Sequence, residues 1–110
     1  MALLPMEHVD DFTEITLTKN NSYVDYDYSK CYSNGKIVIA NLCFRLSATP
    51  PVYTTVISGF PNNGRTTNYG SLASSGGAGR RLVVSGTNLV FEDSNTPSGV
   101  YYSGCVVYTL

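Results

Sequence analysis

The dipeptide Asn34-Gly35 stands between two runs rich in β-branched and aromatic residues. Both of its residues tolerate the positive φ values that a type I′ turn requires, so this pattern is the strongest short-range hairpin signal that a sequence can carry. The runs on either side, residues 22–33 and 36–47, are each long enough for a strand. The sequence therefore predicts an antiparallel β-hairpin centred on this dipeptide.

Side chains alternate along both arms of this hairpin, because successive residues of a strand point to opposite faces. The second arm has one face that is apolar throughout and is predicted to line the core: Val38, Ala40, Leu42, Phe44 and Leu46. In the first arm we expect the core face to be the more apolar of the two, which consists of Val24, Tyr26, Tyr28, Lys30 and Tyr32.

The rest of the chain also favours strands, since no window keeps apolar residues at helical spacing for three turns. Further strands are expected at residues 13–18, 52–58, 80–85, 88–92 and 100–110. Gly86-Thr87 suits the tight connection of a second hairpin. Residues 60–79 are rich in Gly, Ser and Asn and are expected to form a long surface loop, with a short strand near residues 69–73 as an option.

These elements predict an all-β fold, an antiparallel β-sandwich or jelly roll of about 6–8 strands. Residues 13–110 would form a single domain, preceded by an N-terminal arm at residues 1–12. The arm is too apolar for a simple disordered tail, so we expect it to pack against a neighbouring subunit. An apolar final strand and few charges also favour a homo-oligomer, and a trimer is the preferred state.

Charge and hydropathy exclude two classes of partner. Only 14% of residues are charged and the formal net charge is −1, so the cationic field that neutralises phosphates is missing and nucleic-acid binding is not expected. No stretch approaches the roughly 20 apolar residues that span a bilayer, so we expect no membrane insertion.

Patterns for catalysis, metals or cofactors are weak. The single histidine, His8, lies in the arm beside no recognisable nucleophile, and the glycine-rich residues 76–81 lack the Lys-Ser/Thr ending of a P-loop. The three cysteines have no zinc-site spacing and are expected as small buried hydrophobes. One disulfide with one free thiol is the alternative. We predict no metal and no cofactor.

Asp25 and Asp27 form the best carboxylate pair in the sequence, because they point to one side of a strand at roughly 6–7 Å. Such a pair could serve a glycosidase or ligate calcium. The preferred interpretation is polar positions on the solvent side, and we expect a protein that is not an enzyme.

Nine tyrosines and no tryptophan are the most unusual feature of the composition. A tyrosine ring offers an apolar face and a hydroxyl, which suits both sugar stacking and protein interfaces. Core packing is expected to use most of them, while Tyr53 and Tyr69 adjoin turns. Arg65 and Asn68 lie in the same loop as Tyr69, and Arg65 could bind a carboxylate or a sugar hydroxyl or be an ordinary solvated cation. The candidate ligand-binding residues are Tyr53, Arg65, Asn68 and Tyr69.

The order of these elements resembles the small C-terminal β-sandwich domains, the tip or head, of phage and prophage tail-fibre or receptor-binding proteins. The resemblance covers roughly residues 22–110 and is carried by residues 34–44, 53–61, 81–91 and 101–110. The long fibre region usually upstream is not in this sequence, and the three cysteines and low charge depart from the pattern. The resemblance implies a trimer at a virion tail tip, made in the bacterial cytoplasm, that contacts host cell-surface saccharides.

We therefore expect a non-catalytic receptor-binding module whose loops, residues 60–79 and 93–99, contact a host cell-surface glycan. The alternative is a structural virion or assembly protein whose tyrosine-rich surface and apolar arm meet partner subunits, including other tail or virion proteins. A glycan-degrading enzyme that uses a carboxylate pair is the least favoured of the three.

Overall fold

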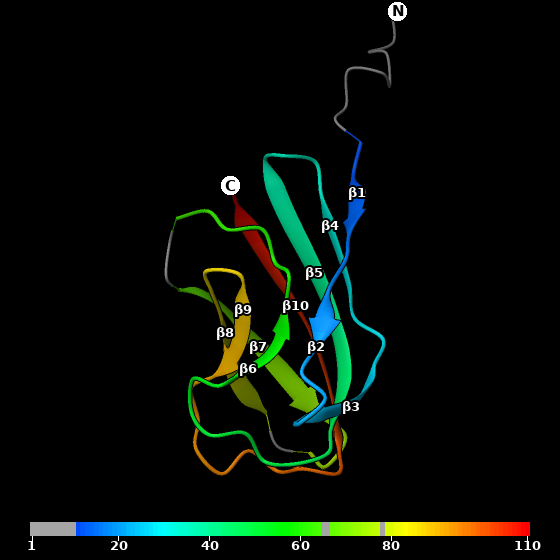
Figure 1. Ribbon diagram of the computed structural model, residues 1–110, viewed down its shortest axis with the longest axis vertical. Helices are drawn as coiled ribbons and strands as arrows, with labels where there is room; N and C mark the ends of the chain where they lie inside the picture. Colours follow the sequence, from blue (N-terminus) through cyan, green and yellow to red (C-terminus); the bar gives the residue numbers. More distant parts are fainter. Residues whose placement is uncertain (1–10, 65–66, 78) are drawn as a thin grey trace, which may run out of the picture.

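A computed structural model describes residues 11–64, 67–77 and 79–110 of the chain (Figure 1). The described residues contain ten strands and no helix: β1 (Thr13–Ile15), β2 (Thr18–Lys19), β3 (Val24–Asp27), β4 (Lys30–Ser33), β5 (Ile37–Leu46), β6 (Thr55–Ser58), β7 (Asn68–Ser74), β8 (Arg80–Ser85), β9 (Asn88–Phe91) and β10 (Tyr101–Thr109). Every pairing between them is antiparallel. The all-β antiparallel class is thus confirmed.

The ten strands belong to one sheet in the order β1-β4-β5-β10-β7-β8-β9-β6-β2, with β3 also paired to β5. The two end strands, β1 and β2, are separated along the chain by Thr16 and Leu17 alone. Residues 13–19 therefore form both end strands of the sheet. This is possible only because the sheet curls around its core. The structure replaces the expected sandwich or jelly roll of 6–8 strands with a single curled sheet of ten.

The first predicted hairpin is confirmed as β4 and β5, whose last pair before the turn is Ser33 with Val38. The turn itself differs from a type I′ turn, because Gly35 has a φ of 88° whereas Asn34 has no positive φ. Asn34 acts through its side chain instead: its Oδ1 accepts the backbone N–H groups of Lys36 and Ile37, both at 2.9 Å. The Asn34 side chain thus stabilises the turn through these two hydrogen bonds, although the Asn34 backbone does not adopt the expected positive φ.

The predicted core face of β5 is confirmed, since all five of its apolar residues are buried. The face assigned to the first arm is wrong. Tyr26 and Tyr28 are 51% and 62% exposed, whereas Cys31 is fully buried. The pairing explains the reversal, because Cys31 faces the inward Ala40 of β5 and Tyr26 faces the outward Arg45.

A β-bulge at Asp25 lets Val24 remain in the core although Tyr26 points outward. The register shifts by one residue between these two positions, so that Val24 pairs with Leu46 and Tyr26 pairs with Arg45. An extra residue in one strand of a pair reverses the facing of the residues that follow. Without the bulge, Tyr26 would lie opposite Phe44 and enter the core.

Two other strands differ in extent from their predictions. The strand given as an option at residues 69–73 of the expected surface loop is confirmed as β7, which is longer and pairs with both β8 and β10. The expected strand at residues 13–18 is divided into β1 and β2, with Ile15 and Leu17 packed against the core. The hairpin at Gly86-Thr87 is confirmed as β8 and β9, which meet at the pair Ser85 and Asn88.

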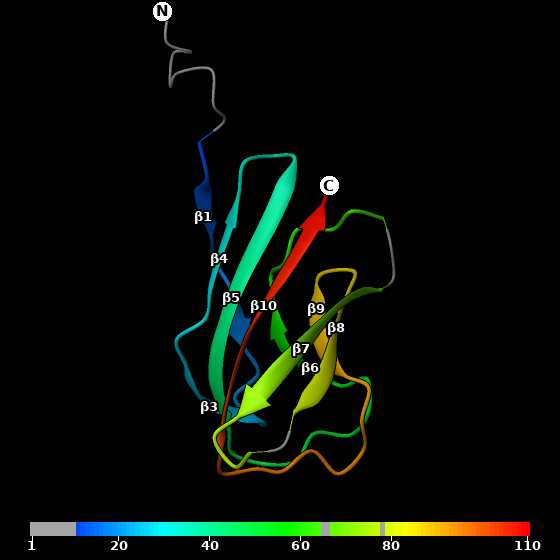
Figure 2. The ribbon, with the colours of Figure 1, turned by 180° about the vertical axis from the view of Figure 1, so that it is seen from behind.

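Strands β5 and β10 run side by side along the molecule, and β7 diverges from β10 away from their shared end (Figure 2). The core inside the curl contains an aromatic cluster in which Phe44, Phe91 and Tyr102 have ring centroids 5.6–6.2 Å apart. The Tyr102 hydroxyl donates to the Pro97 carbonyl at 2.7 Å. Tyr108 likewise donates to the Pro61 carbonyl at 2.6 Å, so two buried phenols of β10 fix two connecting loops.

The cysteines do not share one environment. All three are free thiols, which contradicts the alternative of a disulfide. Cys31 is buried, as expected for a small hydrophobe, but Cys43 is half-buried and Cys105 is exposed on the outside of the sheet. The expectation of burial is therefore wrong for Cys105, because its strand points that residue away from the core.

Candidate functional site

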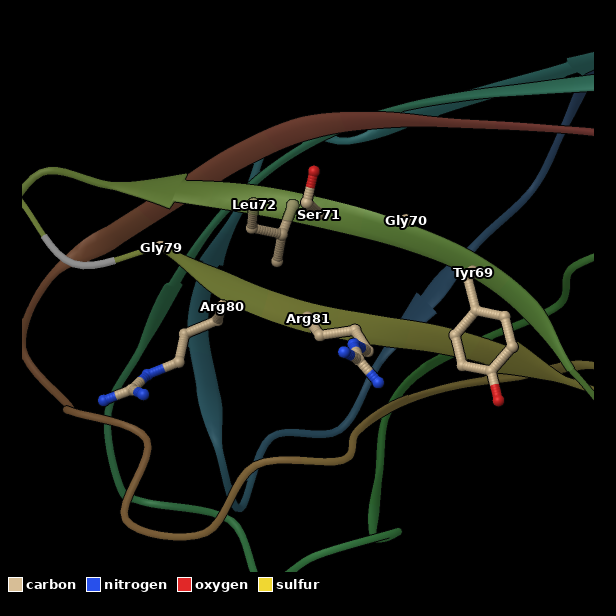
Figure 3. Close-up of a pocket in the computed structure, with 7 residues that line it drawn as sticks. All are labelled: Tyr69, Gly70, Ser71, Leu72, Gly79, Arg80 and Arg81. Carbon is tan, nitrogen blue, oxygen red and sulfur yellow. The ribbon is translucent and has the colours of Figure 1, made fainter.

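A shallow groove of about 650 Å³ follows strands β7 and β8 on the wall of the curled sheet (Figure 3). Its lining consists of Tyr69, Gly70, Ser71, Leu72, Gly79, Arg80 and Arg81. Small-molecule sites in proteins commonly have volumes of about 300–1,000 Å³ and combine apolar surface with a few polar groups. The groove has this size and this mixture of side chains.

Tyr69 and Arg81 are diagonal neighbours across the two strands. Tyr69 pairs with Val83, and Arg81 pairs with Ser71, two residues further along β7. Diagonal neighbours in an antiparallel pair lie roughly 7–8 Å apart on the same face. Figure 3 shows both side chains extending to the same side of the strands. A ring and a guanidinium are thus presented together, and the Tyr69 ring is 56% exposed.

Within the part of the chain that the structure describes, the Arg81 side chain has one weak acidic partner, Glu92. Its Nη1 lies 3.6 Å from Oε1 of Glu92, and 67% of the arginine side chain is exposed, against 19% for the glutamate. The backbone N–H of Arg81 donates to Oδ2 of Asp93 at 3.2 Å, which holds the start of β8 against the 92–100 loop. Most of the guanidinium donors of Arg81 therefore face solvent.

Arg80 extends away from Tyr69 and Arg81 (Figure 3). Its Nε is buried and has no hydrogen-bond partner. The guanidinium lies close enough to Tyr102 to affect its ionisation: burial raises the pKa of the Tyr102 phenol, and the positive charge of Arg80 offsets part of that rise. Arg80 thus borders the groove at one end and the aromatic core at the other.

Of the residues predicted to bind a ligand, the structure describes Tyr53, Asn68 and Tyr69, and these three lie in different surroundings. Tyr69 lines the groove, while its neighbour Asn68 points inward, is buried, and exchanges side-chain hydrogen bonds of 3.2 and 3.3 Å with Asn63. Tyr53 is 66% exposed in the turn before β6. The strand of Tyr69, β7, is separated from β6 by β8 and β9, which places the two strands three strand spacings, roughly 14 Å, apart. Arg65 lies outside the described residues.

A second cluster, which the sequence did not predict, lies on the outer surface of β3, β5 and β10. We call it the tyrosine face, and it consists of Asp25, Tyr26, Tyr28, Arg45 and Tyr101. Arg45 forms an ion pair with Asp25 and lies 6.0 Å above the centroid of the Tyr26 ring. The rings of Tyr28 and Tyr101 stack with centroids 6.4 Å apart and planes 27° apart. Aromatic residues and arginine together are typical of protein interfaces.

The tyrosine face results from the register of three strands. Arg45 of β5 pairs with Tyr26 of β3 on one side and with Tyr101 of β10 on the other. The pKa of Tyr101 is raised by desolvation and, next, by the neighbouring phenol of Tyr28. The signal that could have found this cluster is the alternation in residues 26–32, which groups the tyrosines correctly but does not say which face is the core.

The carboxylates considered for catalysis or calcium both have partners within the protein. Asp25 pairs with Arg45, and Oδ1 of Asp27 accepts the backbone N–H of Ser29 at 2.9 Å. Among the described residues, no group of three or more His, Cys, Asp or Glu side chains could hold a metal ion. In the same part of the chain, no helix is long and apolar enough to cross a bilayer.

Comparisons of this chain with protein-family models, with curated proteins and with solved structures give no match. Its function is therefore argued from the groove and from the tyrosine face.

Proposed function

We propose that this protein is a non-catalytic saccharide-binding module and that the groove along β7 and β8 holds the sugar. The observation that carries the proposal is the exposed Tyr69 ring beside the solvent-facing Arg81 in a groove of about 650 Å³. An aromatic ring offers an apolar platform for the C–H face of a pyranose. An arginine offers several donors in a fixed plane for sugar oxygens.

The position of the groove on paired strands also supports this function. Tyr69 and Arg81 lie on two strands of the curled sheet rather than at a loop tip, so their spacing is set by the register of the ladder. Binding groups that a rigid element positions lose less conformational entropy when a ligand arrives. The proposed site therefore uses residues 69–72 and 79 of the segment expected as a loop at residues 60–79, most of them as part of a strand, and none of residues 93–99.

The narrower proposal is a receptor-binding module at the tip of a phage or prophage tail fibre, assembled as a trimer and recognising a host cell-surface glycan. It rests on the resemblance of residues 22–110 to such domains. Of the β-sandwich that the resemblance implies, the protein shares the antiparallel all-β class, whereas its ten strands form a single curled sheet.

A glycan array followed by calorimetry on the best ligand tests the saccharide proposal. We expect saturable binding that falls roughly tenfold or more in Tyr69→Ala, by analogy with nucleic-acid bases, whose stacking on an aromatic ring contributes on the order of 1–3 kcal/mol. Tyr69→Phe, which keeps the ring, should retain most of the affinity. Tyr53→Ala serves as the comparison for the loop candidate and should bind like the parent protein. Equal binding by the parent and Tyr69→Ala would contradict the groove as the site.

The tyrosine face favours a second candidate function, a structural protein of a virion or assembly whose partner subunit packs on β3, β5 and β10. Its specific support is the exposure of Tyr26 and Tyr28 together with the stacking of Tyr28 on Tyr101. Tyrosine and arginine are enriched among the residues that dominate binding energy at interfaces.

Light scattering of the parent and of a Tyr28→Ser, Tyr101→Ser double variant tests this second candidate. We expect an oligomer for the parent and a smaller mass for the double variant. A matched Ser103→Ala variant on the same strand should keep the parent mass. A parent that remains monomeric at high concentration, with no partner subunit bound, would overturn the structural role and leave the saccharide proposal unaffected.

A further inference from the structure

We propose that the groove selects saccharides that carry a carboxylate, with Arg81 as the residue that binds this group. The inference rests on the proposed saccharide function and adds the chemical class of the ligand. It depends on three observations: the charge of the groove lining, the incomplete pairing of Arg81, and the spacing between Arg81 and Tyr69.

The charge of the groove differs from that of the whole chain. The protein has a formal net charge of −1, yet the groove lining contains two arginines and no acidic residue. The seven lining residues therefore hold two of the seven lysines and arginines in the sequence. Glu92 and Asp93, which contact Arg81, offset part of this charge, and the solvent-facing donors of Arg81 attract an anionic group more than a neutral one.

Arg81 retains donors for a ligand because its interactions within the protein are limited. Its guanidinium contacts Glu92 through Nη1 at 3.6 Å, which is longer than a charge-assisted hydrogen bond of about 2.7–2.9 Å. The nearby Asp93 receives the backbone N–H of Arg81. A guanidinium has five N–H donors in a planar fork that matches the two oxygens of a carboxylate, so a ligand carboxylate can replace the long contact to Glu92 with two short ones.

The spacing of the two groups suits a sugar acid. Tyr69 and Arg81 lie roughly 7–8 Å apart as diagonal neighbours. A pyranose stacked on the Tyr69 ring would direct a carboxylate on its ring carbon toward the guanidinium. Leu72 and the two glycines of the lining add no further charge. Selectivity between acidic and neutral sugars therefore depends on Arg81. Arg80, at the end of the groove, is a secondary source of positive potential.

The experiment compares matched ligands by calorimetry: tetragalacturonic acid against its methyl ester, and sialyllactose against its methyl ester. The two members of each pair share their sugar units and differ in the free carboxylate. We expect the acid of at least one pair to bind roughly tenfold or more tightly than its neutral counterpart, as a bidentate charged hydrogen bond implies. The difference should shrink as salt is raised.

Three variants locate the effect. Arg81→Gln should weaken binding of the acid roughly tenfold or more and binding of the neutral ligand much less, so that the preference for the acid is lost. Arg81→Lys should keep only part of the preference because it lacks the planar fork. Glu92→Gln should strengthen acid binding by a few-fold, since it removes the competing carboxylate. Thermal melting of each variant checks that it is folded.

The outcomes separate the inference from the function on which it rests. Equal binding of acid and neutral ligands, with loss in Tyr69→Ala, would overturn the carboxylate inference and keep the saccharide function. Tighter binding of a sulfated sugar than of every carboxylate, still dependent on Arg81, would also overturn it. Absence of binding to every saccharide in the panel and in the array would overturn both.

Discussion

Gly59 packs so closely against Thr16 that a Cβ atom on the glycine would lie 2.6 Å from the threonine carbonyl oxygen. The glycine also has a φ of 105°, a conformation that L side chains rarely adopt. This contact lies where the residues between β1 and β2 pass the end of β6. The curl of the sheet brings its two ends to this segment, so the approach of these two backbones is part of how the fold closes.

Gly59→Ala should destabilise the protein by about 2–4 kcal/mol, as the sum of a positive-φ cost and an overpacking cost. Gly35→Ala is the matched control, because Gly35 also has a positive φ but no atom within 4 Å of its virtual Cβ. It should cost about 1–2 kcal/mol. Urea unfolding followed by circular dichroism measures both, and equal losses would show that the approach to Thr16 is not tight in solution.

Tyr108→Phe should lower the free energy of unfolding by about 1 kcal/mol, the usual net value of one hydrogen bond. The substitution removes the 2.6 Å bond to the Pro61 carbonyl and keeps the ring in the core. Tyr69→Phe, at an exposed position, is the control and should leave stability within about 0.5 kcal/mol. A similar small change in both variants would mean that water replaces the phenol at Pro61.

The protein should lose stability as the pH rises from about 9 to 12. Burial raises the pKa of the Cys31 thiol to about 11 and that of the Tyr108 phenol to about 12, from ordinary values of 9.0 and 10.0. Both groups are neutral when protonated, and the unfolded chain releases these protons at a lower pH than the folded one. Their contribution is complete below the unfolded pKa values and is lost as the pH passes through the folded ones.

Urea midpoints measured from pH 7 to 12 at constant ionic strength check this dependence. The Cys31→Ala, Tyr108→Phe double variant should be less stable at pH 7 but should show a flatter decline above pH 9. A decline as steep as that of the parent would assign the alkaline loss of stability to other groups.

The three thiols should react with a neutral thiol reagent in the order Cys105, Cys43, Cys31, because exposure falls in that order and burial raises the pKa of the Cys31 thiol. Native protein at pH 8 should label first at Cys105, and Cys31 should react only after urea is added. Mass spectrometry of peptides from timed samples measures the order. Labelling of Cys31 in the native protein at the rate of Cys105 would contradict its burial.

Parts of the fold could be predicted because their signals are local. The hairpin at Asn34-Gly35 depends on turn chemistry within four residues, and the β8–β9 hairpin on a glycine with a φ of 62° at residue 86. The core face of β5 follows from strict alternation along ten residues. The facing of the tyrosine series from Tyr26 to Tyr32 could not be found in this way, because the more apolar face of this arm is the outward one and local alternation therefore indicates the wrong side.

The site was predicted only in part for the same reason. Tyr69 was identified from its exposure near a turn-rich segment, and the structure places it in the groove. Arg81 was missed, because only the register of β7 with β8 brings it beside Tyr69. The segment around Gly70 was expected to belong to a long loop, with a short strand at residues 69–73 as an option. A side chain at Gly70 would overlap Val106, so the glycine serves close packing within a strand.

The sequence by itself determined that this chain forms antiparallel strands, where two hairpins turn, and which side of β5 is buried, since each of these depends on residues a few positions apart. Only the tertiary structure decided that ten strands share one curled sheet, that the tyrosines of β3 and β4 face outward, and that Tyr69 and Arg81 line one groove. These outcomes depend on pairings between distant strands and on a one-residue bulge at Asp25. An alternating pattern of side chains allows either set of residues to face the core until a partner strand fixes the register.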